Sequence, residues 1–174
     1  MKVRLVLGLL VVALTTMGFD CVNDNVLVAV NVTGLTATVN LTPGGTSFDA
    51  TQTISASDYL DVGFEDINLN SFRVYDIRIT TIGTFAGTVN AQVLVNGAQI
   101  LSYSGPWSSF NTPQSLVSSQ LITRNPAGML TLLNAIRNRQ DVQIRTTGTV
   151  SQALPSGLAV RIEVLAQVDA ALTD

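Results

Sequence analysis

Most of the chain alternates apolar and polar residues, which is the period-two pattern of strands that bury one face. In the clearest case, residues 158–168, apolar residues occupy every second position, and Arg161, Glu163 and Gln167 lie on the opposite face. Shorter segments with this alternation are residues 26–32, 35–42, 48–54, 72–79, 89–95, 98–103 and 142–150. About eight strands separated by turn residues predict a mainly β fold, an antiparallel β-sandwich, with a small barrel as the alternative.

Two points in this pattern predict tight turns. Asn96-Gly97 is the strongest hairpin signal in the chain. The alternation slips by one residue at Thr33-Gly34, which predicts a second hairpin that pairs Val32 with Leu35. Residues 56–70 show no period and are expected to be irregular.

Residues 72–79 are predicted to form a strand with three large side chains on one side. These are Tyr75, Ile77 and Ile79, and Arg73 shares their parity. Because alternate residues of a strand face the same way, we expect all three to share one environment.

One helix is predicted at residues 126–139. Asn125 is a favourable N-cap and Pro126 suits the first helical position. An apolar stripe follows at helical spacing, formed by Met129, Leu132, Leu133 and Ile136. We expect this helix to close one open end of the sandwich or to cover an edge strand.

The N-terminus has the layout of a secretory signal peptide. A positive start, Met1–Arg4, precedes the unbroken apolar run 5–14, which is too short to span a bilayer. Cys21 lies just past this run, so residues 1–21 resemble bacterial lipoprotein signal peptides, although Phe19 and Asp20 depart from the small residues of that pattern.

The resemblance implies cleavage before Cys21, lipid attachment at Cys21 and anchoring to a membrane at the cell envelope. Residues 1–20 are then the signal peptide, 21–25 a short tether and 26–174 a single domain. The alternative is cleavage after Gly18, which gives a secreted protein with an unpaired thiol.

Composition excludes several classes of function. The chain has no His, and its one Lys, Lys2, lies in the predicted signal peptide, so His-based triads, Lys Schiff bases and Cys/His zinc sites are excluded. Only 12% of residues are charged, against about 25% in a typical domain. With a net charge of −3 and no basic run, nucleic-acid binding is not expected. A surface of Thr, Ser, Asn and Gln permits self-association.

Four carboxylates gather in the stretch without a period: Asp58, Asp61, Glu65 and Asp66. Clustered oxygen ligands suit Ca²⁺, so these residues are a candidate metal site, although their spacing is not that of an EF-hand. A glycosidase carboxylate pair is a second interpretation, and a solvated acidic loop is the third.

Aromatic residues suggest a second candidate site. Tyr103 and Trp107 flank Gly105-Pro106, and exposed rings at this place would stack on a sugar. The alternative is that Trp107 packs in the core, where its large surface is buried.

These observations predict a non-enzymatic exported protein of the cell envelope, structural or adhesive, with no required cofactor and tethered to the membrane through Cys21. Two alternatives remain open. One is a carbohydrate- or calcium-binding extracellular module, and the other is a subunit of an extracellular assembly built by self-association or strand addition. Fold alone does not choose among them.

Overall fold

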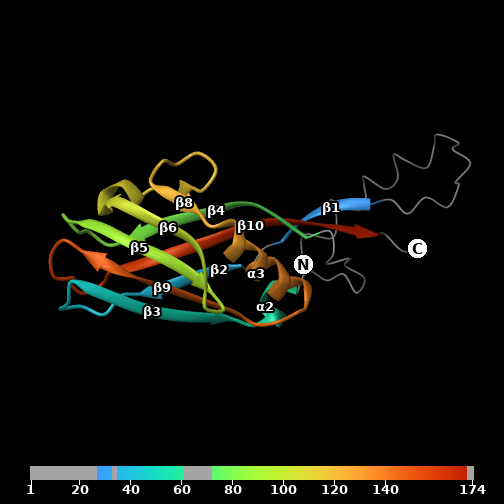
Figure 1. Cartoon of the computed structure of the whole chain (residues 1–174), viewed down its shortest axis with the longest axis horizontal. Coiled ribbons are helices and arrows are strands. Elements are labelled where there is room, and N and C mark those ends of the chain that lie inside the picture. The colour runs from blue at the N-terminus through green and yellow to red at the C-terminus, as the bar shows by residue number, and fades with distance from the viewer. Residues whose placement is uncertain (1–26, 33–34, 61–71, 172–174) are drawn as a thin grey trace, which may run out of the picture.

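Two five-stranded antiparallel sheets pack face to face in the computed structural model, which describes residues 27–32, 35–60 and 72–171 (Figure 1). The first sheet, sheet A, contains β1 (Leu27–Val32), β2 (Thr36–Asn40), β4 (Arg73–Ile82), β7 (Gln114–Ser115) and β10 (Ala159–Ala171). The second, sheet B, contains β3 (Ser47–Ile54), β5 (Thr88–Val95), β6 (Ala98–Pro106), β8 (Ile122–Arg124) and β9 (Val142–Val150).

The strand order identifies the topology of the sandwich. Sheet A runs β1-β10-β4-β7, with β2 also paired to β10, and sheet B runs β3-β9-β5-β6-β8. The chain passes from one sheet to the other at most of its connections, which is the jelly-roll arrangement. The predicted mainly β sandwich is therefore confirmed, and its two shortest strands, β7 and β8, are too brief for alternation to reveal.

The predicted hairpin at Thr33-Gly34 is wrong. Strands β1 and β2 do not pair with each other, because both lie along β10, one after the other. Val32 is opposite Ala166 and Thr36 is opposite Glu163. The chain between Val32 and Thr36 therefore has one residue more than the part of β10 between Glu163 and Ala166. A one-residue excess of the kind found at β-bulges shifts the alternation just as a two-residue hairpin does, and the sequence pattern does not separate the two.

The hairpin at Asn96-Gly97 is confirmed. It joins β5 to β6, and both turn residues have positive φ, 48° for Asn96 and 83° for Gly97. This is the combination that a type I′ turn requires, which explains why Asn and Gly are the residues found there.

Helix α3 (Pro126–Arg137) packs against β6, β5 and β9 at one end of the sandwich (Figure 1). The Asn125 side chain accepts hydrogen bonds from the backbone N–H groups of Ala127 and Gly128, at 3.1 and 3.3 Å. The helix ends two residues earlier than predicted, and Arg139 has a left-handed φ of 53°. Its buried residues are Gly128, Met129, Leu132, Ala135 and Ile136.

A short helix, α2 (Ala56–Leu60), occupies part of the stretch predicted to be irregular. Tyr59 is buried, and its hydroxyl donates to the carbonyl of Gln140 at 2.5 Å. The Ala56 N–H donates to Asp141 Oδ1 at 3.0 Å. Five residues are too few to show a helical period, so these distant contacts, rather than a local pattern, fix this turn.

The predicted signal peptide, residues 1–20, and the predicted tether, residues 21–25, lie outside the described residues. In the part of the chain that is described, no helix has the length and apolar character needed to cross a membrane.

Gly128 lets helix α3 approach sheet B closely. A Cβ atom at this position would lie 1.8 Å from the carbonyl oxygen of Gln99 and 3.0 Å from the backbone nitrogen of Ile100. Because both are backbone atoms of β6, neither can rotate away, and the helix would have to move off the sheet.

We therefore predict that Gly128→Ala destabilises the protein, although Ala favours helices more than Gly does. The expected loss is about 2 kcal/mol in the free energy of unfolding, or roughly 5 °C in Tm. Thermal unfolding followed by circular dichroism measures it. Asn134→Ala, an exposed change in the same helix, is the control and should be neutral or slightly stabilising. An equal effect of both variants would contradict the close-approach explanation.

Candidate functional site

Of the four carboxylates proposed for calcium, the structure describes one. Asp58 lies in α2, and its carboxylate accepts a hydrogen bond at 3.2 Å from the N–H of Ser55, the residue that precedes the helix. Asp61, Glu65 and Asp66 lie outside the described residues, as does Cys21. No group of three or more potential metal-binding side chains occurs among the residues that the structure describes.

Tyr103 and Trp107, proposed as sugar-stacking rings, are both buried, with 1% and 0% of their surface exposed. The Trp107 indole N–H donates to the Gly83 carbonyl at 3.0 Å, and its ring meets that of Phe85 edge-on with centroids 5.7 Å apart. Tyr103 meets Phe110 in the same manner at 5.3 Å. Neither ring offers a face to a ligand, so the structure assigns both to the core.

Among the residues that the structure describes, two hydroxyl groups are buried without a hydrogen-bond partner. They belong to Tyr103 on β6 and Thr146 on β9. Burial raises the pKa of the Tyr103 hydroxyl well above its usual range, and the nearby Thr146 hydroxyl offsets only part of that shift. Since the pair makes no hydrogen bond of normal geometry, both hydroxyls carry an uncompensated cost of desolvation.

A cleft of about 240 Å³ lies where strand β4, the segment after β7, the end of β8 and helix α3 meet. Most of its lining is apolar, and two of its side chains are among the most exposed apolar ones described: Tyr75 is 50% exposed and Val117 is 74% exposed. Arg124 lies at its rim as an exposed cation. The lining residues are Val74, Tyr75, Asp76, Leu116, Val117, Arg124 and Met129.

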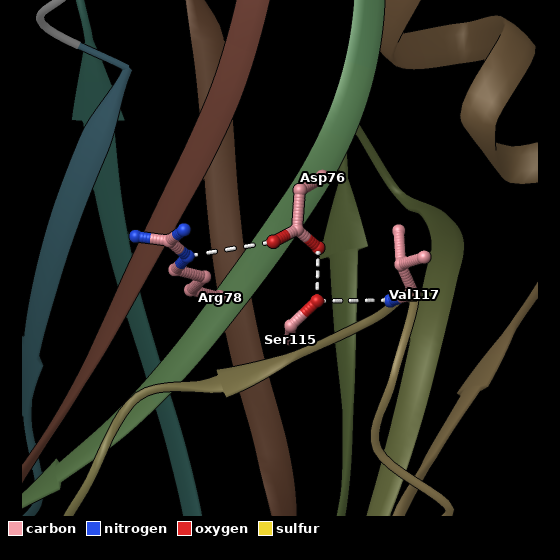
Figure 2. Close-up of polar contacts among 4 residues, drawn as sticks. All are labelled: Asp76, Arg78, Ser115 and Val117. Atoms are coloured by element: carbon pink, nitrogen blue, oxygen red, sulfur yellow. Dashed lines mark hydrogen bonds and ion pairs between the residues drawn. The ribbon is translucent and has the colours of Figure 1, made fainter.

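Asp76 forms the polar part of this cleft and is only 8% exposed. Its carboxylate accepts a hydrogen bond from the Ser115 hydroxyl at 2.8 Å and lies 3.4 Å from the Arg78 guanidinium, as Figure 2 shows. The Ser115 hydroxyl in turn accepts from the Val117 N–H at 3.1 Å (Figure 2). Asp76 thus fixes both the short strand β7 and the backbone that presents Val117.

A register shift in β4 creates the exposed aromatic wall of the cleft. Leu165 is opposite Asp76 and Ala166 is opposite Val74, which leaves Tyr75 without an opposite residue on β10. The prediction that Tyr75 shares a side with Ile77 and Ile79 is therefore wrong, because both isoleucines are fully buried while Tyr75 is half-exposed. Bulges commonly redirect a side chain in this way next to functional sites.

Sequence reasoning missed this cleft because its residues come from four separate segments. No motif links Asp76 to Ser115, and the bulge that turns Tyr75 outward leaves no local signal in the alternation of residues 72–79. The sequence feature that marks the region is Asp76, an acidic residue between Tyr75 and Ile77 in a strand, since Asp is mostly found exposed.

Comparisons with known proteins give little to add. No family model matches the chain, and no curated protein matches it. Among solved structures, a chain of Desmodium yellow mottle tymovirus is similar over 90% of this chain and 89% of its own length, with 12% identity and a TM-score of 0.36. At that TM-score the similarity carries no argument about fold or function.

We predict that Ser115→Ala loosens the wall of the cleft. Removal of the hydroxyl takes one partner from the buried Asp76 carboxylate and one acceptor from Val117, which should cost about 2 kcal/mol in the free energy of unfolding. Urea unfolding measures the loss, and hydrogen exchange at Val117 should accelerate. Ser115→Thr, which keeps the hydroxyl, should retain most of the stability, and Ser108→Ala, at an exposed position, should have no effect. Equal stability of Ser115→Ala and the parent would contradict the role of this contact.

We predict that Tyr103→Phe stabilises the protein, by up to about 1 kcal/mol near neutral pH, since it removes an unpaired buried hydroxyl. Because the pKa of Tyr103 is raised in the folded state, the stability linked to its protonation is fully present below the ordinary tyrosine pKa of 10.0. This stability is lost as pH rises above that value. In urea titrations, the free energy of unfolding of Tyr103→Phe should therefore exceed that of the parent by more at about pH 11 than at about pH 8. These values lie about one unit above and about two units below that pKa. Tyr75→Phe, at a half-exposed ring, is the matched control. A loss of stability in Tyr103→Phe at both pH values would show that the hydroxyl has a partner.

Proposed function

We propose that this protein is a non-enzymatic adhesive protein of the cell envelope, exported by its signal peptide and anchored through a lipid on Cys21. The layout of residues 1–21 supports the export and the anchor. Strand β1 begins at Leu27, six residues after Cys21. A chain of six residues reaches at most about 20 Å, so such an anchor would hold the sandwich near the membrane surface.

The observation that carries the adhesive role is the cleft beside β4. A soluble monomer gains nothing by exposing Tyr75 and Val117 together, whereas a partner that covers them gains the free energy of apolar burial. The hydrogen bonds of Asp76 and Ser115 hold this surface in place, so binding would require little ordering of the protein. Arg124 at the rim adds a cation that can select the orientation of an acidic group.

Among the described residues that line the cleft, the one carboxylate is that of Asp76, which Ser115 and Arg78 already engage. The chain has no His to act as a general base. This supports a binding role for the cleft.

A second candidate function is that of a subunit in an extracellular assembly, and one observation favours it. Strand β7 pairs with β4 only at Arg78 and Ile79. Among the described strands, none pairs with Val74–Asp76 on that side of β4. An extended segment of a neighbouring molecule that pairs there would place an apolar side chain in the cleft.

The anchor is tested by the intact mass of the protein purified from its own cell membranes and from the culture medium. We expect the mass of residues 21–174 plus acyl chains in the membrane fraction, and a Cys21→Ser variant should lose both the acyl mass and the membrane location. Residues 19–174 without added mass, found in the medium for parent and variant alike, would contradict the anchor.

The adhesive surface is tested by Val117→Asp in the producing cells. The change places a charge in the apolar contact, and we expect the retention of cells on surfaces and in aggregates to fall about tenfold, as for the loss of a central interface contact. Ile82→Asp is the matched control, because Ile82 is an exposed apolar residue of β4 outside the cleft. Unchanged adhesion in the folded Val117→Asp protein would contradict the proposal.

A further inference from the structure

The outer face of sheet B carries two complete cross-strand rows of short polar side chains. Register places them directly opposite one another on adjacent strands. The first row, across β3, β9, β5 and β6, is Ser47, Thr149, Asn90 and Ser104. The second row, which extends to β8, is Asp49, Thr147, Gln92, Ser102 and Thr123.

The centre of this face is hollowed into an open groove of about 210 Å³. Ala91 and Gly148 contribute little side chain to it, and the four polar side chains that line it are Asn90, Gln92, Ser102 and Thr149. None of these four side chains forms a hydrogen bond or an ion pair with the rest of the described protein. Their donors and acceptors are therefore available to a ligand.

The groove has no net charge of its own. The charged side chains nearest to it by register are Asp49, at the end of the second row, and Arg145, which lies beside that row on β9. They pair with each other, with Arg145 Nε donating to Asp49 Oδ1 at 2.7 Å. The hydrogen bond from Arg145 lowers the pKa of the Asp49 carboxyl, so the two partners carry opposite charges at neutral pH. The field at the groove favours neither a cation nor an anion.

We propose that this face binds a neutral glycan. Each hydroxyl of a sugar both donates and accepts, and the amides of Asn90 and Gln92, with the hydroxyls of Ser102 and Thr149, supply both functions. Neighbouring strands lie about 4.8 Å apart, so a ligand laid across β9, β5 and β6 meets one polar side chain from each strand. These are inner strands of the sheet, which keeps the lining fixed before the ligand arrives.

A second copy of the chain is a poorer occupant of this face. A stable contact between protein copies needs an apolar core, whereas stacking two such faces would bury amides and hydroxyls without apolar gain. The glycan proposal goes beyond the proposed adhesive function, because it names a class of ligand at a surface distinct from the β4 cleft.

The test is titration calorimetry of the mature protein with neutral oligosaccharides of three to six units, taken from glucans, mannans and xylans. We expect at least one to bind, and Asn90→Ala combined with Gln92→Ala to weaken it by at least about tenfold without lowering Tm. The control is Thr53→Ala, an exposed position of β3 outside the groove, which should leave affinity unchanged. Oligosaccharides carrying sulfate or uronate groups should bind no better than the neutral ones.

Three results would overturn the inference. The first is that no neutral oligosaccharide binds. The second is that one binds with an affinity that the Asn90 and Gln92 changes leave intact. The third is that sedimentation shows a dimer of the parent protein that these same changes dissociate. If no oligosaccharide binds, while cells adhere normally and the Val117→Asp variant lowers that adhesion, this inference alone is overturned. If no oligosaccharide binds and Val117→Asp leaves adhesion unchanged, the adhesive function is overturned as well.

Discussion

The pairing of strand β10 with its neighbours is the constraint on which sheet A depends. One edge of β10 holds β1 and β2 in succession, and the other edge holds β4. Its inward side chains, Val160, Ile162, Val164 and Ala166, are all buried, so a slip of one residue would move this whole row out of the core. Both flanks depart from regular register near Leu165 and Ala166. The departure on the β4 side turns Tyr75 outward, and so the cleft owes its aromatic wall to this pairing.

The sequence was sufficient for the fold class because every long strand carries its own alternating pattern. It was also sufficient for the Asn96-Gly97 turn and the cap of helix α3 at Asn125, where a few adjacent residues decide the geometry. It misassigned the junction after Val32 and the direction of Tyr75, since a bulge and a hairpin shift the alternation alike and the partner strand decides between them. The cleft joins residues that are up to 55 positions apart, Val74 to Met129, and such proximity has no local signal.

The two sheets present different chemistry to solvent. The outer side of sheet A carries charges, among them Arg78 and the Arg161–Glu163 pair. The outer side of sheet B presents rows of neutral hydroxyls and amides, with one ion pair closed on itself. The aromatic rings that the sequence suggested for sugar binding fill the interior instead, where Trp107 satisfies its N–H on Gly83. The outer face of sheet B therefore presents short polar groups placed by backbone register, and the exposed ring that the structure describes is Tyr75, on sheet A.

The two described ends of the domain meet, because Leu27 on β1 is opposite Ala171 on β10, and Figure 1 shows both strands reaching the same end of the molecule. A short peptide linker between them would close the backbone into a ring without disturbing the pairing of β10. The chain would then tolerate circular permutation, with new ends opened in the exposed turn at Asn96-Gly97. Such a permuted protein would display its termini at the turn between β5 and β6 instead of at the end of β1.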